Sequence, residues 1–185
     1  MQYRQFGSAI VAGVLLAVSV IGCAPKSAPP PQVGDSGLKI HNEPNNRMSS
    51  EQWEVYQPAE RSGMASVVAV ARNASASVLC DGKGGLSIQI DSHDGRELKN
   101  PSLKVTFDQG VAADYPWHSN TEEGWGFILL DSQKDYAPII GELKQREILE
   151  AVVSESGKEW HRYQFTLAKA DEAIDYVVKL CGKSS

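Results

Sequence analysis

The feature that most constrains the fold is a set of short segments in which apolar and polar residues alternate. At 86–90 and 103–107 the alternation is strict, so that Leu103, Val105 and Phe107 fall on one face. A period of two places one face of a strand against a core and the other against solvent. Further segments of strand character lie at 53–56, 65–71, 77–80, 124–130, 146–153 and 160–167. The pattern predicts seven or so strands.

A glycine-rich turn joins two of these segments. Residues 81–85 read Asp-Gly-Lys-Gly-Gly and lie between the segments at 77–80 and 86–90. Two alternating runs on either side of turn-forming residues predict a β-hairpin. A phosphate-binding loop would need its glycines to open a helix, whereas these glycines open a strand.

Two helices are expected among the strands. Asp135 can cap the first, with Pro138 in its opening turn. Its apolar stripe consists of Tyr136, Ile139, Ile140 and Leu143. This spacing is typical of a helix that packs one face on a core.

The second helix is expected from near Asp171 to Leu180 or Cys181, and Gly182 is well placed to end it. Its apolar positions follow three-four spacing and are Ala173, Ile174, Val177, Val178 and Cys181. The fold class predicted from these elements is mainly β (α+β). We expect an antiparallel β-sandwich or half-barrel of about seven strands, with a short helix and a C-terminal amphipathic helix docked on the sheet.

Residues 1–22 are typical of a cleaved signal peptide. Arg4 precedes about 13 apolar-leaning positions, too few for the roughly 20 that a spanning helix needs. The run ends in Val20-Ile21-Gly22-Cys23, which resembles the processing box of bacterial lipoproteins. This resemblance implies that Cys23 is diacylated, that cleavage precedes it and that its amino group is acylated. The alternative is a soluble secreted protein with a cysteine near its cleavage site.

The residue after the acylated cysteine is Ala24, which favours an outer-membrane anchor facing the periplasm. Residues 23–50 are rich in proline, glycine and asparagine and are expected to form a tether tens of ångströms long. One exception is the apolar pair in Leu38-Lys39-Ile40, which could add to a sheet edge. The globular domain is expected at 51–185.

The net charge of the chain is negative. Lys and Arg number 18 and Asp and Glu number 23, which gives −5. Such a chain lacks the basic surface of a nucleic-acid-binding protein and does not bind anionic lipid by charge alone.

The cysteines divide between two roles. Cys23 is assigned to lipid by the resemblance, which leaves Cys80 and Cys181. An exported chain with two remaining cysteines usually pairs them, so a disulfide is expected to fasten the last helix to the sheet. The alternatives are a reactive thiol or a metal pair, although no third or fourth ligand lies at metal spacing.

The search for catalytic residues gives no motif and no cofactor. Beyond residue 51 there is no Gly-x-Ser-x-Gly or Ser-x-x-Lys sequence. Ser92, His93 and Asp94 are adjacent, and neighbouring side chains do not converge on one proton. Asp91 and His93 are two potential metal ligands without a third. The acidic pairs at 122–123 and 171–172 are expected to be solvated or to cap a helix.

An aromatic segment is the candidate recognition loop. It contains Tyr115, Trp117 and His118 and is followed by Trp125. Aromatic side chains give large contact areas at low entropic cost, and they stack on sugars such as those of peptidoglycan. The alternatives are that Trp117 and Trp125 fill the ends of the core, or that His118 is a catalytic base.

The order of several residues resembles a family of periplasmic accessory proteins encoded with type VI secretion systems. The residues that carry the resemblance are Trp53-x-Val55, Cys80, Phe165-x-Leu167, Ala173-Ile174 and Cys181. The resemblance covers about residues 50–182, transfers no catalytic residue and implies non-enzymatic assistance to an envelope machine.

Three functions follow from these observations. The first is a membrane-anchored, non-enzymatic binding or scaffold lipoprotein that recognises a protein partner or peptidoglycan. The second is an inhibitor or exclusion factor that acts on an incoming enzyme, phage or conjugation apparatus. The third is an envelope hydrolase whose site is assembled from distant residues such as His118, Asp131, Glu150 and His161.

Overall fold

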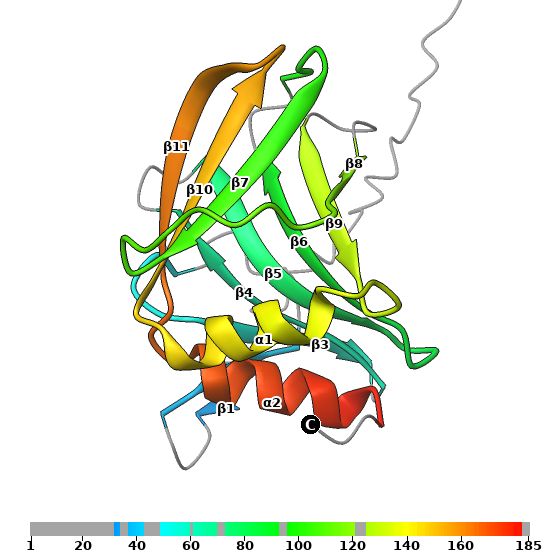
Figure 1. Ribbon diagram of the computed structural model, residues 1–185. Helices are drawn as coiled ribbons and strands as arrows, with labels where there is room; N and C mark the ends of the chain where they lie inside the picture. Colours follow the sequence, from blue (N-terminus) through cyan, green and yellow to red (C-terminus); the bar gives the residue numbers. More distant parts are fainter. Residues whose placement is uncertain are drawn as a thin grey trace, which may run out of the picture.

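The computed structural model describes residues 32–33, 37–42, 49–59, 61–69, 73–92, 96–120 and 125–182. Within them, a large curved sheet faces a smaller one, and two helices lie at one end of this sandwich (Figure 1). The prediction of a mainly β, sandwich-like α+β fold with a terminal helix is therefore confirmed. The predictions for Cys23, for His93 and for the acidic pair at 122–123 lie outside the described residues.

In the described residues the larger sheet has eight strands in the order β1-β2-β3-β4-β5-β6-β9-β8. Their bounds are β1 Gln32–Val33, β2 Lys39–His41, β3 Glu54–Ala59, β4 Ser62–Val68, β5 Ala74–Asp81, β6 Leu86–Ser92, β8 His118–Asn120 and β9 Gly126–Leu130. The expected hairpin joins β5 to β6, and Asp81 Oδ1 accepts hydrogen bonds from the amides of Lys83 (2.7 Å) and Gly85 (2.9 Å). These bonds close the turn.

The smaller sheet has the order β11-β10-β7, with β7 Pro101–Phe107, β10 Ile148–Glu155 and β11 Lys158–Thr166. Both of its pairings are antiparallel. Ser156 and Gly157 connect β10 to β11 with φ values of 51° and 80°. Two positive φ angles in a two-residue loop suit the right-handed twist of a hairpin.

An aromatic cluster fills the core between the two sheets. Trp125 precedes β9, and its ring centroid lies 5.3 Å from that of Tyr163 on β11 and 6.0 Å from that of Trp160. Phe127 packs at 6.2 Å from Trp125. Rings at these separations and tilted to one another add to the stabilisation from burial.

The first helix, α1, spans Tyr136–Gln145. Its buried residues, Tyr136, Ile139 and Leu143, are three of the four predicted for its apolar stripe. The predicted cap is wrong in one respect: Asp135 occupies the N-cap position, but its side chain makes no capping hydrogen bond. Its φ and ψ of −97° and 10° depart from the extended conformation in which an N-cap side chain reaches the following amides.

The second helix, α2, spans Ala170–Leu180 and packs on β4 and β5. Gly63 on β4 lets it come close, because a Cβ there would lie 2.8 Å from Leu180 Cδ1 and 3.3 Å from the Tyr56 carbonyl oxygen. The predicted disulfide is confirmed: Cys80 on β5 is bonded to Cys181 at the end of α2. Gly182 follows with a φ of 68°, as a helix-ending glycine does.

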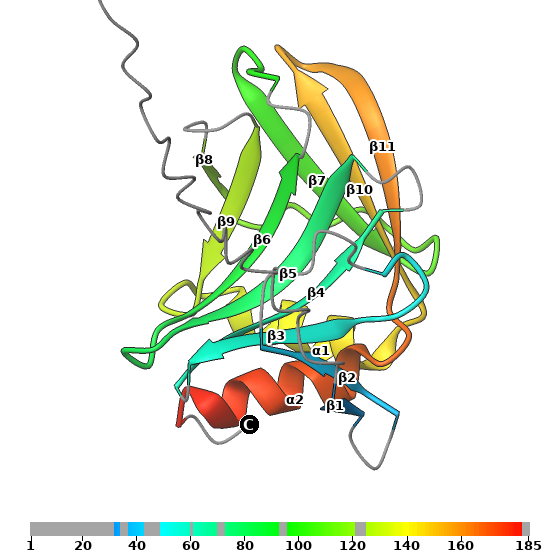
Figure 2. The same cartoon turned by 180° about the vertical axis from the view of Figure 1, so that it is seen from behind.

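We call β1, β2 and Leu38, the residue just before β2, the N-terminal strap. Figure 2 shows it beside β3 at the edge of the large sheet. Leu38 is buried in the core, and Ile40 packs against it. The expectation that 38–40 could add to a sheet edge is therefore confirmed, with β2 parallel to β3.

Glu54 on β3 also holds the strap. Its carboxylate is buried, and its two oxygens bind Lys39 Nζ at 3.2 Å and His41 Nε2 at 2.9 Å. A buried carboxylate needs such partners, since desolvation of an unpaired charge is costly. No helix in the described part of the chain is long and apolar enough to cross a membrane.

Candidate ligand-binding groove

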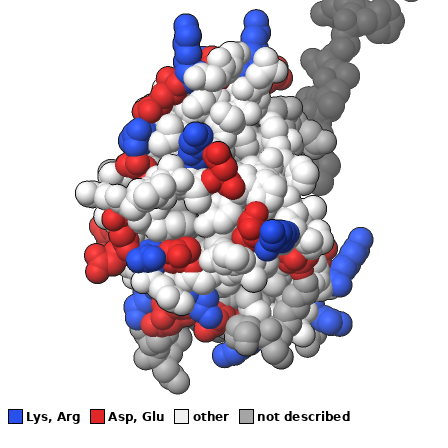
Figure 3. Space-filling model, in the orientation of Figure 1, with Lys and Arg blue, Asp and Glu red and all other residues white. Residues whose placement is uncertain are grey.

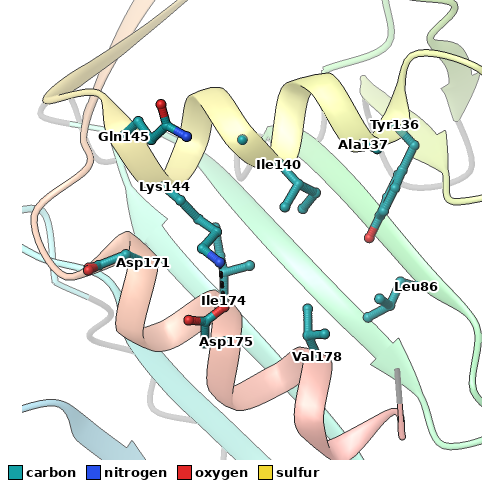
Figure 4. A pocket seen from close by; sticks show the side chains of 11 residues that line it. Leu86, Tyr136, Ala137, Ile140, Lys144, Gln145, Asp171, Ile174, Asp175 and Val178 are labelled. Carbon is teal, nitrogen blue, oxygen red and sulfur yellow. Dashed lines mark hydrogen bonds and ion pairs between the residues drawn. The ribbon is translucent and has the colours of Figure 1, made fainter. Parts of the chain in front are cut away.

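The candidate site is a groove of about 640 Å³ between α1 and α2. Its volume lies in the range of small-molecule sites, which is about 300–1,000 Å³. Figure 4 shows side chains from both helices directed into it, with Leu86 at the start of β6 on the far side. Two helices that cross one end of a sandwich leave such a groove where their facing side chains do not meet.

The walls of the groove are mainly aliphatic. Ile140 comes from α1, and Ile174 and Val178 come from α2. Ile174, Val178 and Leu86 are buried, whereas Ile140 is half-buried. Ile174 is fully buried, so an apolar molecule in the groove would contact mainly Ile140 and the accessible edges of Leu86 and Val178. Such contact removes apolar surface from water, which is favourable.

A glycine in the middle of α1 widens the groove. Gly141 lines it, and a Cβ placed on Gly141 would meet no atom within 4 Å. Glycine inside a helix costs roughly 0.5–1 kcal/mol relative to alanine. At Gly63 close packing favours glycine, but at Gly141 no neighbouring atom does. The bare backbone leaves space in which another molecule can touch the helix.

Tyr136 gives the groove a polar group at depth. The side chain is only 8% exposed, and its hydroxyl has no hydrogen-bond partner within the described structure. Figure 4 shows that the ring points from the first turn of α1 into the groove. Burial raises the pKa of the Tyr136 hydroxyl to about 12, so the group keeps its proton and remains a donor at neutral pH.

Two of the three charged residues that line the groove form an ion pair. Lys144 Nζ on α1 lies 2.6 Å from Asp175 Oδ1 on α2, and the pair bridges the two helices (Figure 4). Both side chains are partly exposed, so the pair adds little to stability. Its main effect is that the groove presents no unpaired charge beside its aliphatic walls, apart from the exposed Asp171 at its rim.

The residues of the predicted recognition loop differ in burial, and one of them belongs to the core. Trp125 is 2% exposed and belongs to the aromatic core, so its assignment to a surface loop is wrong and the core alternative holds for it. Trp117 and Tyr115 are half-buried, with ring centroids 6.4 Å apart in an edge-to-face arrangement. Burial raises the pKa of Tyr115, and Glu142 and Asp135 raise it further. His118 is exposed on β8.

The loop does not contribute to the groove. Gln133 holds it by donating from Nε2 to the Pro116 carbonyl oxygen at 2.6 Å, and this Nε2 lies 3.2 Å from His118 Nε2. None of the four predicted loop residues lines the groove.

The residues of the hydrolase hypothesis are not gathered in the groove either. His118, Asp131, Glu150 and His161 are all absent from its lining. Glu150 is ion-paired with Arg162 on the neighbouring strand. No group of three or more His, Cys, Asp or Glu side chains in the described residues could hold a metal ion.

Asp91, which lies outside the groove lining, also has a shifted pKa. It lies on β6 opposite Ser75 and Gly126, on the face of the sheet that points away from Ile88 and Ile90 of the core. Burial raises the pKa of the Asp91 carboxyl to about 6.

Figure 3 shows acidic and basic side chains interspersed over one face of the molecule, with no single-sign patch on that side.

The apolar spacing of α1 predicts Tyr136 and Ile140 as part of its core stripe and does not indicate a role for Gly141. The one signal for a site was the glycine itself, which interrupts an otherwise good helix on the same side as Ile140 and Lys144. A mid-helix glycine indicates close packing or close approach of another molecule.

Comparisons with known proteins give little similarity. No family model matches the sequence, and no curated protein matches it. Among solved structures, the crystal structure of invasion associated protein B from Bartonella henselae is similar with a TM-score of 0.49 and 12% identity. The match covers 76% of this chain and 100% of that one.

Proposed function

We propose that this chain is a non-enzymatic, lipid-anchored binding module of the bacterial cell envelope, and that it holds an apolar ligand in the groove between α1 and α2. The observation that carries the binding role is the buried Tyr136 hydroxyl, which has no partner and points into an aliphatic groove. The processing box ending at Cys23 supports the anchor. The resemblance to type VI secretion accessory proteins supports a role without chemistry.

The lining of the groove bears on the partner. Peptidoglycan is a polar polymer, and its recognition calls for exposed aromatic faces and several donors. The groove offers the aliphatic side chains of Leu86, Ile140 and Val178 and one buried hydroxyl, while its other polar side chains are the Lys144–Asp175 pair and the exposed Gln145 and Asp171. An apolar molecule or an apolar part of an envelope protein therefore matches the groove better than a sugar chain does.

The anchor is tested by metabolic labelling. Cells that express the full chain are grown with radiolabelled palmitate, beside cells that express Cys23→Ser. We expect label on the wild-type polypeptide in the outer-membrane fraction and none on the variant. Equal labelling of both, or an unlabelled and soluble wild-type product, contradicts the anchor.

The groove is tested with 1-aminoanthracene, an uncharged apolar dye whose fluorescence rises in dry sites. The protein used is the mature chain carrying Cys23→Ser, exported so that its disulfide forms. We expect saturable binding at one site, which Gly141→Leu abolishes because the added side chain occupies the open space. Gly141→Ala is the matched control and should bind the dye. Dye binding that ignores Gly141→Leu rules out the groove as the site.

A further inference from the structure

We infer that the ligand of the groove is an uncharged, largely apolar small molecule that carries an acceptor oxygen, such as a ketone, ester or ether, which accepts a hydrogen bond from the Tyr136 hydroxyl. This inference rests on the proposed function, because it assigns the chemistry of the ligand in the same groove. Three features of the groove carry it.

The first feature is the unsatisfied donor. A buried hydroxyl without a partner costs roughly 1–3 kcal/mol, and a ligand acceptor that bonded to it would recover part of this cost. With a pKa of about 12, the Tyr136 hydroxyl is a donor and not a phenolate under physiological conditions. A donor at the bottom of an aliphatic groove selects a ligand whose buried end bears an acceptor.

The second feature is that Lys144 and Asp175 are paired with each other, so that among the lining side chains that the structure describes only Asp171, at the exposed rim, carries an unpaired charge. Lys144 would attract an anionic head group, but its Nζ is already 2.6 Å from Asp175 Oδ1. A carboxylate brought to Lys144 would also meet the negative charge of Asp175 and of Asp171 at the rim. An ammonium group would meet the positive charge of Lys144, and the unpaired carboxylate of Asp171 is exposed at the rim and not beside the aliphatic walls. No unpaired charge lies beside those walls, so the part of the ligand that they hold is neutral.

The third feature is the exposed helix backbone at Gly141. With no atom within 4 Å of the Cβ position, a flat or unbranched molecule can lie against α1 between Ile140 and Lys144. Tyr136 and Lys144 are eight residues apart, which is about 12 Å along a helix. That length suits an apolar body of small-molecule size.

The experiment is displacement of 1-aminoanthracene by a matched series of eight-carbon probes: octan-2-one, octanoate and octylammonium. We expect octan-2-one to bind at least fivefold more tightly than either charged probe. In Tyr136→Phe the affinity for octan-2-one relative to the dye should fall about fivefold, which corresponds to about 1 kcal/mol for one hydrogen bond. Tyr176→Phe is the control on α2: its hydroxyl donates to Gln57 Oε1 at 2.6 Å, away from the groove lining, so neither affinity should change.

A charge swap tests the neutral preference. Asp175→Asn frees Lys144 and should raise the affinity for octanoate several-fold relative to octan-2-one. If octanoate binds best in the wild-type chain, or if Asp175→Asn does not favour it, the assignment of a neutral ligand is overturned. If Tyr136→Phe leaves the relative affinity for octan-2-one unchanged, the assigned hydrogen bond is overturned.

A last arm separates a small molecule from an apolar protein segment with the same chemistry. The probe is N-acetyl-Leu-Leu-amide, which is uncharged, apolar and rich in acceptor oxygens. Binding tenfold tighter than that of octan-2-one assigns the groove to a protein partner and overturns the small-molecule assignment. In each of these outcomes, the proposed function is upheld if the wild-type chain binds the dye and Gly141→Leu does not. If the wild-type chain does not bind the dye, or if Gly141→Leu still binds it, the proposed function is removed.

Discussion

Replacing Tyr136 by phenylalanine should make the ligand-free protein more stable. The substitution removes a single hydroxyl that is buried and unpartnered, and it leaves the ring in place. Removing an unsatisfied group recovers part of its desolvation cost of roughly 1–3 kcal/mol. We expect the low end of this range, a gain of about 1 kcal/mol in the free energy of unfolding. For a domain of this size this corresponds to about 4 °C in Tm.

The assay is urea unfolding of the mature chain carrying Cys23→Ser, followed by circular dichroism. Tyr176→Phe is the matched variant on the neighbouring helix, because its hydroxyl donates a hydrogen bond to Gln57 at 2.6 Å. Its loss should cost about 1 kcal/mol, so the two Tyr→Phe changes should have opposite signs. A loss of stability in Tyr136→Phe as large as that in Tyr176→Phe would show that the Tyr136 hydroxyl has a partner, and the argument for the groove would fail.

Three further predictions concern stability. Burial raises the folded-state pKa of Asp91 to about 6, so between about pH 4 and pH 6 the folded protein binds one proton more than the unfolded chain. The free energy of unfolding should therefore fall as pH rises through this range. Urea titrations at several pH values measure this fall, and Asp91→Asn should flatten it. Gly141→Ala should raise the melting temperature through a gain of about 0.5–1 kcal/mol, while Gly63→Ala should lower it, because only at Gly63 does the new Cβ meet protein atoms. The double change Cys80→Ser and Cys181→Ser removes a disulfide between residues 101 apart and should lower the free energy of unfolding, measured in urea, by about 3–4 kcal/mol. An unchanged free energy of unfolding would mean that packing alone holds the end of α2.

Much of the fold could be predicted from the sequence because its signals are local. Strict alternation at 86–90 and 103–107 corresponds to β6 and β7, and three-four spacing corresponds to α2. The pairing of Cys80 with Cys181 followed from counting cysteines once Cys23 was assigned to lipid. The strands that the pattern missed, β1 and β8, have two and three residues, which is too short for a period of two to appear.

The candidate site could not be predicted in the same way, because it depends on how two helices face each other. The spacing that puts Tyr136 and Ile140 on one side of α1 is the spacing of a core stripe, and nothing local indicates that α2 stops short of covering them. Trp125 shows the opposite error. It stands near turn residues, as an exposed aromatic side chain would, yet Trp160 and Tyr163 from a distant strand enclose it.

If Cys23 carries the anchor as proposed, the N-terminal strap limits the distance between the domain and the lipid bilayer. Only residues 24–31, eight in number, would then separate Cys23 from the first residue of β1. Eight residues span at most about 29 Å when fully extended, whereas a chain free as far as Trp53 would have 29 residues and could span about 100 Å. With the strap paired to β3, such an anchor would hold the β1 edge of the domain within about 29 Å of the bilayer.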